Sequence, residues 1–228
     1  MKIIYYILVL TLLGCSGTKT VSNSVTNQKT QSESFEGYVT YKITSVKPDG
    51  IPQEQWDEKL KEIMGDQGYF LKKNYYRPNQ FTSDINSGLE EGFEVYNPSD
   101  SLHYSWQVNA DTVYTQNHNK ESFITIKDFI ELDTVATIND ISCKAMKVKF
   151  TIGQVIVWYN PEIIKISGND YKGTSFEKEI IAKINTLPVK AEVGGMLIFE
   201  MIDYKRMPLD DAIFKIPEFK EVVELPTF

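Results

Sequence analysis

Alternation of apolar and polar residues along short runs most constrains this chain, because period two is typical of a half-buried β-strand. Directly after Phe35, the residues Val39, Tyr41 and Ile43 alternate with polar neighbours. Shorter aromatic-rich runs follow, separated by polar turns, at residues 69–76, 93–96, 102–106 and 112–115. Closely spaced short strands joined by polar turns predict an antiparallel meander.

Longer apolar runs in the second half predict strands over residues 143–150, 154–159 and 196–202. Residues 155–159 are apolar on both faces, so a sheet that contains them needs cover on both sides. Residues 52–64 and 175–185 have helical spacing of apolar side chains, although a strand is an alternative for the second segment. Together these patterns predict an α+β fold, with a mainly antiparallel, curved, half-barrel-like β-sheet and about two helices packed on its concave face.

The first fifteen residues predict a bacterial lipoprotein signal. Lys2 precedes an apolar run, residues 3–13, that is too short to cross a bilayer, since a spanning helix needs about 20 residues. The run ends in Leu12-Leu13-Gly14-Cys15, which resembles a lipobox, in which the cysteine is acylated and the chain is cut just before it. The sequence therefore predicts a signal peptide over residues 1–14 and lipidation at Cys15.

The predicted mature chain has two parts. Residues 16–34 are rich in Ser, Thr and Asn and cannot bury enough apolar surface to offset their ordering entropy. The segment 15–34 is thus expected to be a lipidated disordered tether, and residues 35–228 a single β-rich domain. The formal net charge of −7 argues against nucleic acid as a partner, because phosphate binding needs a basic surface.

No arrangement of residues in the sequence predicts catalysis, a metal site or a cofactor. His103 and His118 lack the spacing of metal ligands, and Cys143 lies in a predicted strand with no activating neighbour. The pair Asp210-Asp211 is typical of a solvated turn. We therefore expect a protein that is not an enzyme.

A half-barrel that curves around its helices would leave any ligand site between helix and sheet. The side chains expected there are Trp56 and Leu60 of the first helix, Trp158 of a central strand, and Ile180 and Ile184 of the second helix. Two interpretations stay open. Either the helices fill the space as a core, or they lie loosely over an apolar void.

Several motifs resemble lipoproteins of unknown function from Bacteroidetes. The lipobox, the Ser/Thr-rich tether and residues 35–43 are similar to the start of such proteins. Residues 141–145, 157–159 and 187–189 resemble GLPGLI-type proteins, without the namesake motif. The order of strand, helix and meander is also similar to the periplasmic lipoprotein carriers LolA and LolB, and this resemblance implies an apolar cavity for acyl chains.

These observations predict a lipoprotein anchored in the outer membrane through Cys15 and facing the periplasm. Ser16 follows the cysteine, and the next residues carry no acidic cluster of the kind that resembles a surface-export tag. The expected function is non-enzymatic binding of a lipid, another amphiphile or an envelope partner protein. The alternative is a structural or interaction lipoprotein with a filled core and no small-molecule ligand.

Overall fold

The computed structural model describes residues 34–86, 91–117, 124–173 and 175–225. Within these residues, twelve strands are hydrogen-bonded into one sheet in the order β12-β6-β5-β4-β3-β2-β1-β11-β10-β9-β8-β7. Neighbouring strands are antiparallel except β6 and β12, which are parallel. The sheet is open, with β12 and β7 at its two edges.

The sheet contains the predicted strands and further strands that the alternation did not indicate. The strands of the sheet are β1 (Gly37–Ser45), β2 (Phe70–Arg77), β3 (Gln80–Asn86), β4 (Glu91–Asn97), β5 (Leu102–Gln107), β6 (Thr112–Gln116), β7 (Ile126–Ile138), β8 (Ile141–Phe150), β9 (Gln154–Tyr159), β10 (Lys190–Val193), β11 (Leu197–Arg206) and β12 (Glu221–Glu224).

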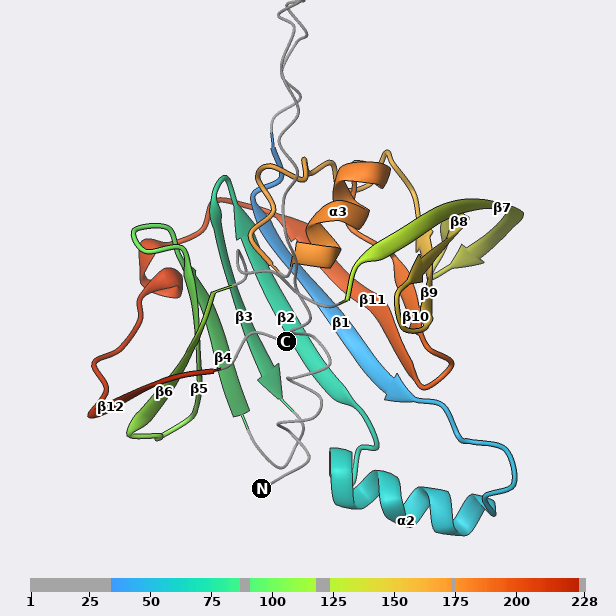
Figure 1. The fold of residues 1–228 in the computed structure, drawn as a ribbon, viewed down its shortest axis with the longest axis horizontal. Coiled ribbons are helices and arrows are strands. Elements are labelled where there is room, and N and C mark those ends of the chain that lie inside the picture. The colour runs from blue at the N-terminus through green and yellow to red at the C-terminus, as the bar shows by residue number, and fades with distance from the viewer. Residues whose placement is uncertain (1–33, 87–90, 118–123, 174, 226–228) are drawn as a thin grey trace, which may run out of the picture.

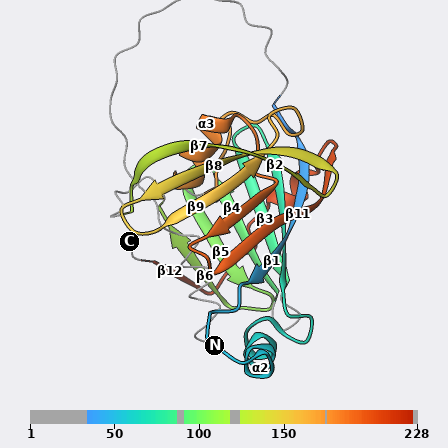
Figure 2. The same ribbon diagram turned by 90° about the vertical axis from the view of Figure 1, so that its right-hand side faces the viewer.

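The sheet is strongly twisted and curved. Figure 2 shows β7, β8 and β9 running across the direction of β1, β2 and β3. β-Bulges contribute to this curvature, because an extra residue bends a strand and increases its twist. Register shifts occur between Thr40 and Tyr41 in β1, and between Leu132 and Val135 in β7. The result is a trough with one concave face, which confirms the predicted α+β class with a curved antiparallel sheet.

Two α-helices accompany the sheet, and they occupy different places (Figure 1). Helix α3 (Ser175–Ile184) lies over the concave face. Helix α2 (Gln53–Met64) lies beyond the ends of β1 and β2, and the last turns of this helix pack against Ile43 and Phe70. Thus α3 covers the trough as expected, whereas α2 closes only one end of it. A short 3-10 helix, η1 (Asp211–Phe214), follows β11.

Helix α3 spans two hydrophobic clusters of the trough. Ile181 belongs to a cluster with Val39 and Tyr41 of β1. Ile180 and Ile184 belong to a second cluster with Val148 of β8, which also includes β9 side chains. Adjacent residues of α3, Ile180 and Ile181, thus belong to different clusters, whereas Ile180 and Ile184, one turn apart, share one, so the helix packs on both parts of the sheet.

The predicted signal peptide, Cys15 and nearly all of the predicted tether lie outside the described residues. The described part of the chain begins at Ser34, whose hydroxyl donates a hydrogen bond to Asp170, at 3.1 Å.

Candidate functional site

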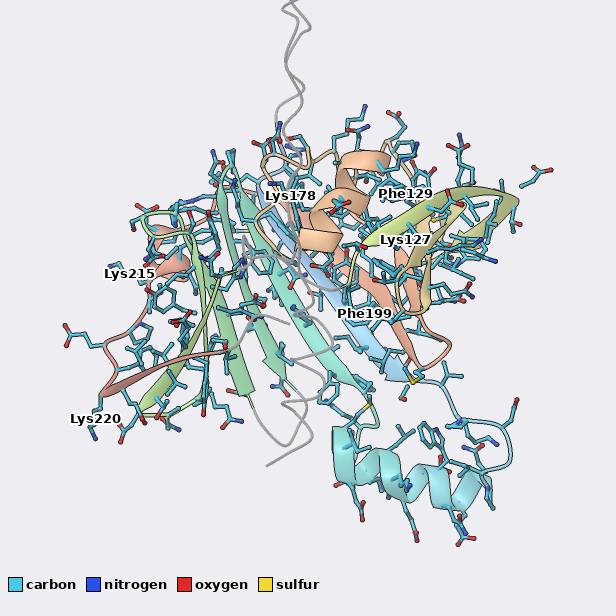
Figure 3. The ribbon with its side chains drawn as sticks, in the orientation of Figure 1. Lys127, Phe129, Lys178, Phe199, Lys215 and Lys220 are labelled. Atoms are coloured by element: carbon cyan, nitrogen blue, oxygen red, sulfur yellow. The ribbon has the colours of Figure 1, made fainter. Side chains whose placement is uncertain are left out.

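A cavity of about 320 Å³ lies between α3 and the concave face of the sheet. The floor comes from neighbouring strands, with Val155 and Val157 on β9, Ala191 on β10 and Phe199 on β11. Figure 3 shows Phe199 on the part of β11 that lies below α3. These residues share the concave face because Val157 pairs with Ala191, and Ala191 pairs with Phe199.

The roof of the cavity is formed by α3 and the segments that flank it. Ile180, Ile181 and Glu177 of the helix line it, together with Tyr171 before the helix and Leu187 after it. Most of the lining is therefore aliphatic or aromatic. A cavity of this size is at the lower end of the range for small-molecule sites, about 300–1,000 Å³.

One wall of the cavity is polar. This wall is formed by Lys72 and Asn74 of β2. Both side chains lie on the face of β2 that also carries the buried Phe70 and Tyr76. The side-chain amide nitrogen of Asn74 donates to the Tyr76 hydroxyl at 3.0 Å. The amide oxygen of Asn74 has no hydrogen-bond partner among the described residues.

Behind this wall, Glu94 of β4 is the common partner of several buried polar groups. One carboxylate oxygen lies 2.9 Å from Nδ1 of His103, and the other lies 3.6 Å from Nζ of Lys72. The Ser83 hydroxyl lies 3.4 Å from the same second oxygen. Burial of these groups is tolerable because each has a partner.

Three tyrosine hydroxyls at the cavity are buried and stay protonated at neutral pH. The Tyr171 hydroxyl donates to Glu177 at 2.6 Å, and the Tyr41 hydroxyl donates to the carbonyl oxygen of Pro188 at 2.8 Å. Burial is the main cause that raises the pKa of Tyr41, Tyr76 and Tyr171 well above the usual value for tyrosine. The negative charge of Glu177 raises these three pKa values further.

The cavity reaches solvent near two turns. Ile152 in the β8–β9 turn and Met196 after the β10–β11 turn line the cavity, and they are 57% and 55% exposed. Gly194 and Gly195 form the second turn with φ angles of 57° and 70°, which glycine adopts without strain. These two glycines thus form the hairpin turn that joins β10 to β11. We call the exposed pair Ile152 and Met196 the apolar rim.

The structure does not bring all the sequence-predicted ligand residues together. Ile180 lines the cavity, and Ile184 is buried next to it against β8 and β9. Trp158 lies on the opposite face of β9 from Val155 and Val157, and the indole nitrogen of Trp158 donates to Glu192 at 3.3 Å. Alternation along an extended strand is the reason.

The two predicted residues of the first helix are also outside the cavity lining. Leu60 packs on the cluster of Ile43, Phe70 and Leu197, and Trp56 is partly exposed on α2. Both positions follow from the placement of α2 at one end of the trough. Of the five predicted ligand residues, Ile180 is the one that lines the cavity.

The polar wall was missed in the sequence. A signal for it exists, because period two places Lys72 and Asn74 on the same face of their strand as Phe70 and Tyr76. Polar side chains in register with large apolar ones indicate a buried polar site or a ligand contact. The sequence carries no comparable signal for the contact between Glu94 and His103, because the two residues come together only through the pairing of β4 with β5.

The other residues considered in the sequence have ordinary structural positions. Cys143 is fully buried in β8, and burial raises the pKa of this thiol. Asp210 accepts a hydrogen bond from the backbone nitrogen of Ala212 and caps η1, whereas Asp211 pairs with Arg77 at 2.7 Å. His103 is buried, and His118 lies outside the described residues.

Two further searches gave negative results for the described part of the chain. It contains no group of three or more His, Cys, Asp or Glu side chains arranged to hold a metal ion. None of its helices is both long and apolar enough to span a bilayer.

Comparisons with known proteins assign no family. No protein-family model matches the chain, and no curated protein matches it. Two structures of PNGF-II align with 84% of this chain at 12% and 11% identity, with TM-scores of 0.45 and 0.46, but this covers only 31% and 32% of the PNGF-II chains. An uncharacterized conserved protein from Thermus thermophilus aligns over 83% of this chain and 91% of its own length, at 9% identity and a TM-score of 0.44. Similarities this weak carry no argument about function.

Proposed function

We propose that this protein is a membrane-anchored binding module that holds a lipid or another amphiphile between α3 and the concave face of the sheet. The observation that carries the proposal is the largely apolar cavity of about 320 Å³. A mostly apolar cavity that reaches solvent and has this volume falls within the range of small-molecule sites. An apolar chain in the cavity would gain the contacts that the lining side chains now lack.

The apolar rim supports the same proposal. Ile152 and Met196 leave more than half of their surface in water while they line the cavity. An amphiphile that enters between these two turns would meet apolar side chains along its whole path. The rim therefore provides an opening through which a hydrocarbon chain passes without crossing the polar wall.

The proposed cellular setting comes from the N-terminal sequence. Acylation of Cys15 would anchor the mature chain in the outer membrane, facing the periplasm, because several acyl chains on one cysteine hold a protein stably. The binding module would then act at a lipid surface. Neither the reaction of an enzyme nor a cofactor is part of this proposal.

The test fills the cavity from its floor. Ala191 faces the cavity from β10, and the variant Ala191→Phe places a ring in the void. Ala212→Phe is the matched control, because Ala212 is exposed on η1 and far from the lining residues. Each variant is made in the full-length chain with Cys15→Ser, so that no anchor competes for detergent or lipid.

Binding of 1-decanol is measured by calorimetry, and co-purified amphiphiles are measured by native mass spectrometry. We expect Ala191→Phe to weaken binding by about tenfold or more, since the lost cavity contacts exceed about 1.4 kcal/mol. The Ala212→Phe control should bind like the parent chain. If the parent chain neither binds 1-decanol nor retains a co-purified amphiphile, the proposal fails and the structural or interaction lipoprotein is the better interpretation.

A further inference from the structure

The side chain of Asn74 is an unusual feature of the cavity wall. It is 7% exposed and lines the cavity, yet its amide oxygen has no hydrogen-bond partner among the described residues. The amide nitrogen is held by the Tyr76 hydroxyl at 3.0 Å, which fixes the orientation of the group. Buried acceptors in native structures are almost always paired, so this oxygen lacks a donor that a ligand would supply.

The charges near Asn74 decide which kind of donor fits. The carboxylates of Glu177 and Glu94 both raise the pKa of Tyr76, whose hydroxyl contacts Asn74. Lys72, the lysine of the lining, lies 3.6 Å from Glu94 and so faces a carboxylate already. An anionic head group would thus be repelled by two carboxylates and an amide oxygen, and the lysine beside it is already paired with Glu94. A neutral donor could bond the amide oxygen of Asn74 without bringing a further negative charge near Glu177 and Glu94.

We propose that the ligand is a neutral amphiphile with a hydroxyl head group, which donates its hydrogen bond to the amide oxygen of Asn74. This inference rests on the proposed function and specifies the class of ligand. The hydrocarbon chain lies over Phe199 and Val193, which line the cavity, and points toward the apolar rim. The polar wall and the apolar floor then each contact the part of the ligand that matches them.

The test compares three probes of equal chain length that differ only in the head group. 1-Decanol has a hydroxyl donor, methyl decanoate has acceptors only, and decanoate is an anion. Affinities are measured by calorimetry near neutral pH with the full-length Cys15→Ser chain. We expect 1-decanol to bind about 3- to 10-fold more tightly than either of the others, which is the range for one buried hydrogen bond.

Two variants test the role of Asn74 itself. Asn74→Leu keeps the size of the side chain and removes the acceptor, and it should abolish the advantage of 1-decanol over methyl decanoate. Asn169→Leu is the matched control, because Asn169 is exposed on a turn and does not line the cavity, and it should leave the ranking unchanged. The ranking in the parent chain does not depend on how well Asn74→Leu folds.

The outcomes separate this inference from the proposed function. Equal affinity for the three probes, or tighter binding of methyl decanoate or decanoate, would overturn the inference and leave the binding module in place. An advantage of 1-decanol that persists in Asn74→Leu would also overturn it. Failure of all three probes to bind, together with the absence of a co-purified amphiphile, would overturn the proposed function.

Discussion

Three buried tyrosines at the cavity should make the free energy of unfolding depend on pH in the alkaline range. Tyr41, Tyr76 and Tyr171 have pKa values above the usual range, first because burial disfavours the phenolate. In the unfolded chain they ionise near pH 10. Above that pH the folded state therefore binds more protons than the unfolded state, and the free energy of unfolding decreases as the pH rises.

The variant Tyr41→Phe tests this linkage. Above pH 10, each tyrosine that stays protonated in the folded state lowers the free energy of unfolding by about 1.4 kcal/mol per pH unit. Tyr41→Phe should therefore make the decrease of the free energy of unfolding with pH less steep by about that amount. Between about pH 7 and pH 9 the two profiles should run parallel, with the variant less stable by roughly 1 kcal/mol because the hydrogen bond to Pro188 is lost. Urea unfolding at a series of pH values measures both effects. Parallel profiles through the alkaline range would show that Tyr41 ionises normally in the folded protein.

The contact between helix α3 and the preceding loop depends on the absence of a side chain at Gly168. A Cβ atom at this position would lie 2.5 Å from Cβ of Ala182 and 3.0 Å from the carbonyl oxygen of Lys178. Both neighbours belong to α3, so the loop approaches the helix closely only because residue 168 is glycine. This contact holds the roof of the cavity at its observed height.

Gly168→Ala should therefore move or loosen α3. We expect a loss of about 1–3 kcal/mol in the free energy of unfolding, the usual range for overpacking. Adding Ala182→Gly removes the nearest clashing atom, so the double variant should be more stable than the sum of the two single changes predicts. Urea unfolding of the four chains provides the double-mutant cycle. Strict additivity would mean that residues 168 and 182 do not meet in solution.

The elements of this fold differ in how far the sequence predicts them. Residues 52–64 and 175–185 were predicted as helices, the second with a strand as the alternative, and α2 and α3 match them closely because their apolar side chains recur at helical spacing. The thirteen-residue strand β7 was missed. It is an edge strand with charged residues and a register shift, so its alternation is interrupted. The four-residue strand β10 is too short to show a period.

At the scale of the whole molecule, the curved sheet was predictable and the cavity was not. A strand such as β9, apolar on both faces, requires cover that a curved sheet provides. Whether Ile180 and Ile181 fill the trough or leave a void depends on the height of α3, which contacts such as Gly168 with Ala182 set. The periodicity of the sequence does not indicate the distance between α3 and the sheet. The polar wall differs in this respect, because Lys72 and Asn74 lie on one strand and period two places them on the face of Phe70 and Tyr76.

The first described residue and the cavity mouth lie at opposite ends of β1. Ser34 precedes β1, whereas Met196 lies beside Val46, after the other end of that strand, where the two are joined by a 2.7 Å backbone hydrogen bond. As a flexible coil, the segment from residue 15 to residue 34 would span on the order of 25 Å. Such a segment sets the distance of the body from a membrane but not its orientation. The proposed anchor would thus decide where the cavity acts, independently of what it binds.

Replacing the acylated thiol tests the anchor without disturbing the cavity. We expect the chain to partition into the detergent phase when cells are extracted and phase-separated, and Cys15→Ala to move it to the aqueous phase. Loss of the acyl chains removes the membrane attachment that the sequence predicts for the mature chain. Cys143→Ala is the matched control, because this thiol is buried in β8 and its loss leaves the anchor intact. The partition is measured by immunoblotting of both phases. If Cys15→Ala stays in the detergent phase to the same extent as the parent chain, Cys15 is not the anchor.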